Sequence, residues 1–507
     1  MKDRPEAPCA TNILFPAALA VLIRLQDFFV HFHDWDEAAM MAQAWAVTQG
    51  QILYVDIFQI HPALNIFFFV PFFLIFNPDT APHLIKITNC LLIIGGAVLV
   101  YMCARARTKN QHTGMIASTA FVLCFAANWA KSSHGEFYAA FPLLGAAYLL
   151  LFKKNPIYRD YFSAGICLAV ACFFKQTAVF DSAALLAGAL LLRSDSGQTT
   201  RQMRAAFAGA LTIFTAVSMY FLYAGAWTQA MTSMWITPLT GYSGLAEAPG
   251  LYSFFTQRAH TLSAVVRSVA AELPVLTLAA ASGAAITLRA KKPRVLTEPE
   301  RVCAACLLWL ITDLVGIALI GRFYPHYLIQ IIAPLILLSV FALRMIPEGK
   351  LEILFKTFAL LTFSLALRSA SSAISELAAR NWAPKRVVQS QKTAEIIRKV
   401  TKPTDRIFLY RAWNLDVFFL SRRLSNNGIY MFIDMISEHS KNREIEAAKR
   451  KEFTDNLPRV IAVDPTGWLF PKADAFFRDI LRRHYDLLTS ETGINIYLKR
   501  TPRDHDD

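Results

Sequence analysis

Long apolar runs separated by short polar segments fill the first three quarters of the chain. A membrane-spanning helix needs about 20 mostly apolar residues, with about 17 as the practical minimum. The runs that approach or exceed this length are 11–31, 83–103, 113–130, 137–152, 158–174, 177–193, 205–226, 264–288, 302–320, 327–344 and 352–372. The pattern therefore predicts a mainly α-helical, polytopic membrane protein with about 11 transmembrane helices.

The run 64–77 is shorter and contains Pro71, so it fits either a short span or a helix at the membrane interface. The positions of Lys and Arg distinguish these alternatives, because cytoplasmic loops of membrane proteins are enriched in both. With a cytoplasmic N-terminus and a non-spanning 64–77, most basic residues fall inside. The outer connections before residue 350 then carry only Lys131, Lys175, Arg258, Arg267 and Arg322. A spanning 64–77 would reverse the bias, so we expect this run to be interfacial or re-entrant and the C-terminus to be outside.

Residues 375–507 differ from the rest of the chain because they are charged and show the patterns of a soluble domain. Short apolar or alternating runs predict strands, and apolar residues at helical spacing predict amphipathic helices. The predicted strands are 406–410, 459–463 and 494–498, and the predicted helices are 385–400 and 471–487. We therefore expect a transmembrane domain over 1–374 and a small extracytoplasmic α/β domain over 375–507, with an acceptor-binding or structural role.

The composition supports the membrane assignment. Hydrophobic residues make up 55% of the chain and charged residues only 17%, against about 25% charged in an average soluble protein. Neither a soluble globular protein nor a disordered chain accommodates so much apolar surface. The net charge of +14 does not indicate nucleic acid, because the basic residues gather in the predicted cytoplasmic loops.

The first outer loop, 32–82, begins with three clustered acids, Asp34, Asp36 and Glu37, and carries no Lys or Arg between His31 and Ala63. The segment after these acids predicts a short helix on the membrane surface, with Met41, Ala44, Trp45 and Thr48 on one face. Asp34 can cap this helix, and Glu37 completes a capping box. Asp36 would then lie in the first turn, where the helix dipole favours an anion.

Three further polar clusters fall on the predicted outer side, in KSSHGEF (131–137), CFFKQTAVF (172–180) and GRFYPHY (321–327). Charges at membrane level are costly and are usually functional. The alternative for Lys175 and Arg322 is that they extend to lipid headgroups. Lys175, Arg322 and His326 together can bind a phosphate in the membrane plane, because Arg offers a two-pronged fork and Lys a point charge. Lys86 is expected to extend to the interface, and Asp181 and Asp313 to make polar contacts between helices.

The sequence contains no glycine-rich phosphate loop, no dinucleotide fingerprint and no zinc-protease motif. A nucleotide-sugar donor would need a soluble nucleotide-binding fold in the cytoplasm, and the chain shows none there. An outward-facing sugar transferase therefore has to take its donor from a lipid carrier.

These motifs resemble the GT-C superfamily of polytopic glycosyltransferases that use polyprenyl-phosphate sugars. The chain is most similar to the bacterial branch with protein mannosyltransferases and lipid A aminoarabinose transferases. The matching features are Asp36-Glu37, the YxD…HPAL segment (54–64), the Glu136 loop, the Lys175-Gln176 turn and GRFYPHY before an apolar helix. The outer α/β domain also fits. The family commonly has Pro-Pro where this chain has His61-Pro62-Ala63.

The resemblance implies an inverting sugar transfer on the outer face of a bacterial inner membrane. The donor would be a polyprenyl-phosphate sugar and the acceptor a hydroxyl of lipid A or lipopolysaccharide, a surface glycan or a protein. Asp36 would be the general base, with Glu37 as the second choice, and Lys175, Arg322 and His326 would stabilise the leaving phosphate. The other residues expected to bind substrates are Asp56, His61, His134, Glu136, Gln176 and Tyr324. Family members differ in metal use, and no close ligand spacing here calls for a metal or another cofactor.

Three other functions remain open from the sequence. A flippase or transporter of lipid-linked sugars would line a path with intramembrane charges, but inverted repeats are not visible and the ionisable residues cluster on one side. A GT-C-like ligase or polymerase would move a whole glycan chain. A non-catalytic scaffold would use its outer domain to bind a partner.

Overall fold

The computed structural model describes residues 10–192, 196–238, 251–288, 297–320, 323–344, 346–382, 384–411, 414–428, 430, 443–466 and 471–500. The chain divides into two compact units. The first, named here the helical unit, consists of Met1–Gln26, Ile87–Leu222 and Ala248–Ser375. The second, named the mixed unit, consists of Asp27–Lys86, Tyr223–Glu247 and Glu376–Asp507. The whole first outer loop, 32–82, therefore groups with the C-terminal region.

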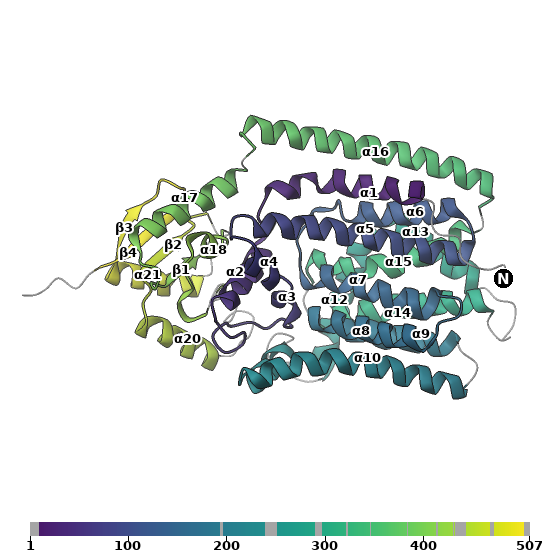
Figure 1. The fold of residues 1–507 in the computed structure, drawn as a ribbon, viewed down its shortest axis with the longest axis horizontal. Helices are drawn as coiled ribbons and strands as arrows, with labels where there is room; N and C mark the ends of the chain where they lie inside the picture. Colours follow the sequence, from purple (N-terminus) through teal and green to yellow (C-terminus); the bar gives the residue numbers. More distant parts are fainter. Residues whose placement is uncertain are drawn as a thin grey trace, which may run out of the picture. The chain divides into compact units, whose positions relative to one another are not determined.

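Most of the helices belong to the helical unit. They are α1 (Ala10–Arg24), α5 (Ala81–Thr108), α6 (Gln111–Cys124), α7 (Gly135–Ala147), α8 (Tyr158–Phe174), α9 (Ala178–Leu192), α10 (Ser196–Tyr223), α12 (Leu251–Glu272), α13 (Pro274–Leu288), α14 (Glu298–Ile320), α15 (Leu328–Leu343) and α16 (Glu348–Ala379), with the short helices η2 (Asn128–Ala130), η3 (Tyr148–Phe152) and η6 (Pro325–Tyr327). The long helices α5, α10 and α16 of this unit run along a similar direction (Figure 1). Each predicted apolar run is helical over most of its length. The predicted mainly α-helical membrane fold is confirmed.

In the part of the chain that the structure describes, fewer helices than the eleven predicted spans meet the length and hydropathy expected of a membrane-spanning helix. Among the described residues, 6 helices are long and apolar enough to cross a membrane, or up to 7 if the bent pair α12–α13 is one span. Helices α1, α6, α8 and α9 have 15, 14, 17 and 15 residues, which is short for a span. The single helix predicted over 264–288 is wrong, because the chain bends by 106° at Leu273. Pro274 explains the break, since proline lacks the N–H that a continuous helix requires.

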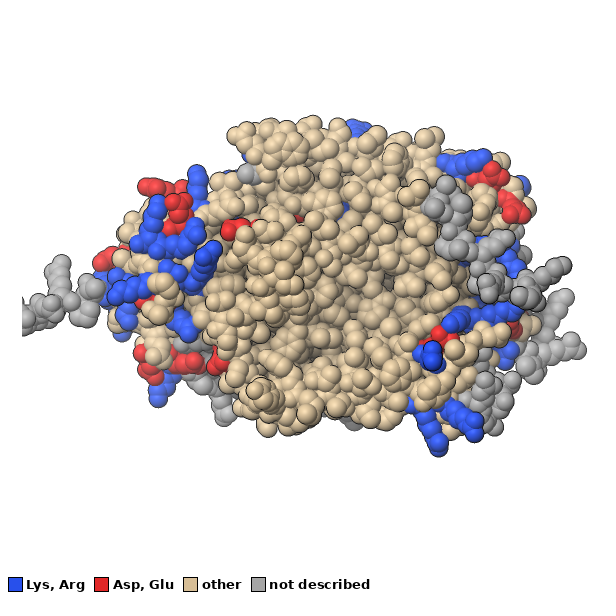
Figure 2. Space-filling model, in the orientation of Figure 1, with Lys and Arg blue, Asp and Glu red and all other residues tan. Residues whose placement is uncertain are grey.

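The helices of this unit differ in how they are covered. Helix α15 is apolar and buried along nearly its whole length, which places it in the core of the unit. Helices α10 and α16 leave large apolar side chains exposed, such as Phe207 and Leu360. In Figure 2 the surface of these helices is almost free of Lys, Arg, Asp and Glu, which gather where α5 ends and α10 and α16 begin. An apolar band bounded by charged helix ends is the surface expected of a protein in lipid.

The mixed unit combines short helices with a small sheet. Its helices are η1 (Leu25–Phe29, from Asp27 on), α2 (Trp35–Thr48), α3 (Leu64–Phe67), α4 (Val70–Ile75), α11 (Trp227–Met231), η4 (Thr232–Ile236), α17 (Lys385–Val400), α18 (Val417–Ser421), η7 (Asn426–Gly428), α20 (Arg443–Asp455) and α21 (Pro471–His484). Its strands are β1 (Ile407–Tyr410), β2 (Val460–Val463), β3 (Tyr485–Thr489) and β4 (Asn495–Lys499). The sheet order is β1-β2-β4-β3, with β1 and β2 parallel and the other pairs antiparallel.

The predicted C-terminal α/β region is confirmed with one correction. The three predicted strands correspond to β1, β2 and β4, and Phe408, Phe453 and Phe477 form part of the core that covers the sheet. The helix predicted over 471–487 ends at His484, and the next residues form β3. Tyr485 is buried and donates its hydroxyl to the Pro458 carbonyl at 2.6 Å, so tertiary pairing overrides the local helical pattern.

The run 64–77 forms two short helices, α3 with 4 residues and α4 with 6. Pro71 lies in the first turn of α4, where proline is tolerated but cannot continue a preceding helix. Neither helix is long enough to span a bilayer, in agreement with the predicted interfacial or re-entrant segment.

Candidate functional site: an acidic helix N-terminus and a cationic cluster

The acidic stretch of the first loop starts helix α2. Asp34 has an extended backbone and its Oδ1 accepts the N–H of Glu37 at 2.9 Å, which is the geometry of an N-cap. The predicted capping role of Asp34 is confirmed. The predicted capping box is wrong, because the Glu37 carboxylate binds His33 and Lys86 instead. Asp36 is half-buried in the first turn of the helix, where unpaired N–H groups and the helix dipole favour a negative charge.

Helix α2 is confirmed, but it is not buried on one face only. Residues 38–46 are all buried, and α3, α4 and α18 pack against the helix. The alanine-rich sequence explains this burial, because Ala38, Ala39, Ala42 and Ala44 let neighbouring elements approach closely from several sides.

Glu37 has a structural role in the loop. Its Oε1 lies 2.6 Å from Nζ of Lys86 at the start of α5, and its Oε2 accepts the backbone N–H of His33 at 2.8 Å. Both side chains of the ion pair are fully buried. The expectation that Lys86 extends to the membrane interface is therefore wrong, because the buried carboxylate of Glu37 holds its ammonium inside the unit.

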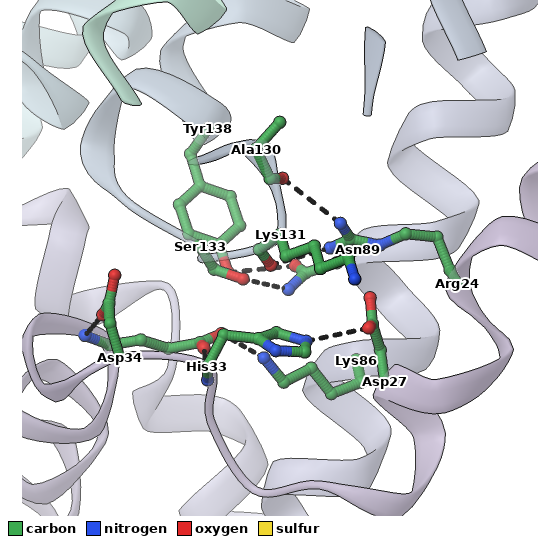
Figure 3. A network of polar contacts seen from close by, with 11 residues as sticks. Arg24, Asp27, His33, Asp34, Lys86, Asn89, Ala130, Lys131, Ser133 and Tyr138 are labelled. Carbon is green, nitrogen blue, oxygen red and sulfur yellow. Dashed lines mark hydrogen bonds and ion pairs between the residues drawn. The ribbon is translucent and has the colours of Figure 1, made fainter. Parts of the chain in front are cut away.

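His33 and Asp27 form a second contact before the helix. Nε2 of His33 lies 2.8 Å from Oδ1 of Asp27 (Figure 3). Burial lowers the pKa of His33 and the nearby Lys86 ammonium adds to this effect, while Asp27 opposes it. The imidazole is therefore neutral near pH 7 and donates its Nε2–H to Asp27. Asp27–His33 and Glu37–Lys86 together hold the turn that leads into α2.

Asp56 and His61 belong to the turn that follows α2. Asp56 is exposed, and its Oδ2 accepts the N–H of Ile52 at 2.7 Å. Tyr54 has a φ of 70°, unusual for a residue with a side chain, and it donates its hydroxyl to the His61 carbonyl at 2.6 Å. Their predicted substrate contacts remain predictions.

The helical unit brings three of the polar clusters together. Glu136, in the first turn of α7, pairs with Nζ of Lys175 at 2.5 Å and lies 3.9 Å from Nε2 of His326. The His326 ring lies parallel to the rings of His134 and Tyr324, with centroid distances of 3.9 and 5.7 Å. Glu136, Lys175 and His326, named here the cationic cluster, come from parts of the chain far apart in sequence.

Lys175 is nearly buried where α8 ends, and its side chain is 8% exposed. Besides Glu136, its Nζ lies 4.7 Å from the centroid of the Tyr327 ring, a favourable position for a cation. The His326 side chain is 19% exposed, and Gln176 next to Lys175 is half-buried. Arg322 lies outside the described residues, so its predicted place beside the cluster remains a prediction.

A buried polar network supports the segment before α7 (Figure 3). Arg24 donates to the carbonyls of Ala130 and Lys131 at 3.2 and 2.9 Å. Asn89 donates to Ser133 and accepts the Tyr138 hydroxyl. These bonds fix the turn from which His134 and Glu136 project. Sequence analysis did not identify Asn89 as a support of the site, because a neutral polar residue in an apolar run carries little signal alone.

Among the described residues no group of three or more His, Cys, Asp and Glu side chains is arranged to hold a metal ion.

No protein-family model and no curated protein matches this sequence. Among solved structures, ArnT from Cupriavidus metallidurans bound to undecaprenyl phosphate is similar over 98% of this chain and 99% of its own, with a TM-score of 0.58 and 13% identity. The chain has the GT-C fold. The apo state of the same ArnT matches over 96% of this chain and 97% of its own at a TM-score of 0.58 and 12% identity.

The GT-C fold is also found in the Archaeoglobus fulgidus oligosaccharyltransferase complex with Zn and sulfate. That structure is similar over 89% of this chain and 68% of its own, with a TM-score of 0.52 and 12% identity. The resemblance inferred from the acidic loop and the GRFYPHY segment is thus confirmed at the level of the fold.

Proposed function

We propose that this protein is an integral-membrane inverting glycosyltransferase that moves a sugar from a polyprenyl-phosphate donor to a hydroxyl acceptor. The observation that carries the proposal is the likeness over 98% of the chain to an ArnT structure that holds undecaprenyl phosphate. The cationic cluster supports it, because a donor of this kind presents a phosphate at membrane level. The acceptor class is lipid A or lipopolysaccharide, a surface glycan or a protein.

The cationic cluster suits an exchangeable phosphate. Without a ligand, Glu136 neutralises Lys175, so that no isolated charge is buried. An ammonium has three N–H donors, and the ion pair uses one of them. Lys175 can therefore donate to a phosphate oxygen while Glu136 holds it in place, and His326 and Arg322 supply further donors. Concentrating donors on the oxygen that gains charge is usually a large contribution to catalysis.

The reaction assigned to these groups is a single displacement. The carboxylate of Asp36 takes the proton of the acceptor hydroxyl, whose oxygen attacks the anomeric carbon. The bond from that carbon to the lipid phosphate breaks, the phosphate leaves with the bonding electrons, and the configuration at the sugar inverts. A carboxylate at a helix N-terminus is favoured in its ionised form, which is the form a base needs. Glu37, the neighbouring carboxylate, is the second choice.

The proposed orientation follows the basic loops. The N-terminus lies in the cytoplasm, the bundle over residues 1–374 crosses the bacterial inner membrane with eleven helices, and residues 375–507 lie in the periplasm. The shorter helices α1, α6, α8 and α9 count as spans in this proposal.

The test is acceptor-dependent release of undecaprenyl phosphate by the full chain in proteoliposomes. The donors are synthetic undecaprenyl-phosphate hexose, N-acetylhexosamine and aminopentose, and the acceptor is a cell-envelope extract. We expect release from at least one donor, and a loss of about 10²–10⁴-fold in Asp36→Asn. Asp34→Asn is the matched control, because Asn is also a good N-cap and should leave most activity. If wild type and Asp36→Asn transfer at equal rates and Glu37→Gln does not, the general base is Glu37 instead of Asp36. No release from any donor would remove the transferase assignment.

A further inference from the structure

The C-terminal part of the mixed unit is joined to the segment before α2 by a buried hydrogen bond between His31 and Asp416. Nδ1 of His31 lies 2.8 Å from Oδ2 of Asp416, and each side chain is only 1% exposed. The other oxygen of Asp416 accepts the Ser390 hydroxyl at 2.8 Å, and that hydroxyl oxygen accepts from Asn414 at 2.7 Å. Asp416 therefore connects the loop that precedes α2 to helix α17.

A second junction lies on the other side of α2 and depends on a glycine. The N–H of Phe58 donates to the Gly428 carbonyl at 3.1 Å. Gly428 has a φ of +64°, and a Cβ added there would lie 1.6 Å from the carbonyl oxygen of Asp56. Only glycine fits this approach of two backbones. Nearby, the Tyr430 hydroxyl donates to Gln51 at 2.7 Å.

A third junction is apolar. Helix α18, which follows Asp416, packs against α2. The ring of Phe419 lies 5.2 Å from that of Phe73 in α4. The first two junctions flank α2 along the chain, at His31 and at 51–58. The third contacts α2 itself and α4. The helix that carries Asp36 is thus held through its flanking segments and its own packing.

We propose that the C-terminal α/β region is a platform that positions the acidic first loop, with His31, Asp416 and Gly428 as positioning residues for Asp36. This inference rests on the proposed function of Asp36 as the base. It assigns residues 376–507 a task in the transfer step itself, in place of binding the acceptor. A displacement of about 1 Å at a reacting group costs roughly 10²-fold in rate, so a loosened platform should lower kcat.

The first experiment compares two glycines with left-handed backbones. Gly428→Ala collides with a backbone carbonyl, whereas Gly493, with a φ of +79°, would place its Cβ 3.0 Å from the flexible Gln389 side chain. Both variants carry the same type of backbone strain, but only Gly428 faces the first loop. In the undecaprenyl-phosphate release assay, we expect Gly428→Ala to lower kcat roughly 10–100-fold without changing KM for donor or acceptor. Gly493→Ala should keep the wild-type kcat.

The second experiment removes the His31–Asp416 hydrogen bond by His31→Ala, Asp416→Ala and the double substitution. If the pair acts as one junction, the double variant should lose no more kcat than the more severe single variant, which is the non-additivity expected of contacting residues. Asp416→Asn tests the junction more gently, because the amide oxygen still accepts from His31, and should retain more activity than Asp416→Ala. Size-exclusion chromatography and circular dichroism identify the variants that fold. If Gly428→Ala does not fold, the comparison of kcat between Asp416→Asn and Asp416→Ala tests the positioning role instead.

The outcomes separate this inference from the proposed function. One outcome would overturn the platform role of the α/β region while leaving the proposed base intact. In it, wild type is active, Asp36→Asn is inactive, and Gly428→Ala and His31→Ala fold and keep the wild-type kcat. A raised KM for the acceptor at unchanged kcat would also overturn it, in favour of acceptor binding by the α/β region. If wild type and Asp36→Asn do not differ, the proposed base itself fails.

Discussion

In the proposed donor site, Lys175 and Arg322 are the residues expected to hold the phosphate. Lys175 is held by Glu136 and by the Tyr327 ring, so its ammonium has a defined position before any donor arrives. We expect Lys175→Ala and Arg322→Ala each to raise KM for an undecaprenyl-phosphate sugar and to lower kcat. Arg322→Lys should rescue only partly, because the two-pronged fork is lost. Donor titrations of the three variants check this. Full activity in both alanine variants would contradict the proposal that Lys175 and Arg322 bind the donor phosphate.

The buried pair Glu37–Lys86 makes a prediction about stability. Lys86→Met leaves the Glu37 carboxylate buried without its cation, which typically costs about 3–5 kcal/mol. Adding Glu37→Gln removes the unpaired charge and should recover part of the lost stability. The amide oxygen of the new side chain can still accept the His33 backbone N–H. Lys356→Met is the control, because Lys356 and Glu352 form an exposed i,i+4 pair worth about 0.3–0.5 kcal/mol. The midpoint of thermal unfolding in detergent is measured for wild type, Lys86→Met, Lys86→Met with Glu37→Gln, and Lys356→Met. Equal midpoints for Lys86→Met and Lys356→Met would contradict the structural role of the pair.

At the scale of elements, the segment 64–77 decides the topology. Two helices of 4 and 6 residues are too short to cross a bilayer, and in the proposed orientation the loops after them keep the sides that the basic residues indicate. A reporter that is active only in the periplasm, fused after Lys499, should be active, and the same reporter inserted in 104–112 should be silent. Activity of a cytoplasmic reporter after Lys499 would mean that 64–77 spans the membrane.

At the scale of the whole molecule, the competing function is a transporter of lipid-linked sugars. Asp313 on α14 is buried, and near it in the helical unit Asp181 on α9 accepts the Trp309 indole N–H at 2.8 Å and Gln330 at 3.4 Å. The predicted contacts between helices are therefore present for Asp181. A transferase should tolerate Asp313→Asn with kcat within about twofold, since Asn has a similar shape, whereas a transporter depends on intramembrane charges. Release and flipping assays on this variant distinguish the two, and a selective loss of flipping would favour the transporter.

The sequence alone determined the properties that depend on local composition. Apolar runs of spanning length, the asymmetry of Lys and Arg, and the strands β1, β2 and β4 follow from residues that are neighbours in the chain. The cap at Asp34 was also predictable, because an N-cap bonds an N–H only three residues away. The resemblance to the GT-C fold rested on the order of such local motifs along the chain.

Only the tertiary structure decided which distant residues meet. Lys86 lies in an apolar helix whose hydropathy is the same whether its ammonium reaches the interface or Glu37. The pairing of Glu136 with Lys175 and His326 depends on how α7, α8 and α15 pack, and β3 depends on a neighbour strand that a helical pattern cannot reveal. The grouping of the first loop with the α/β region rests on His31–Asp416 and on the backbone approach at Gly428. Interactions across hundreds of residues leave no periodic signal in sequence, because their energy comes from burial and pairing that exist only in the folded chain.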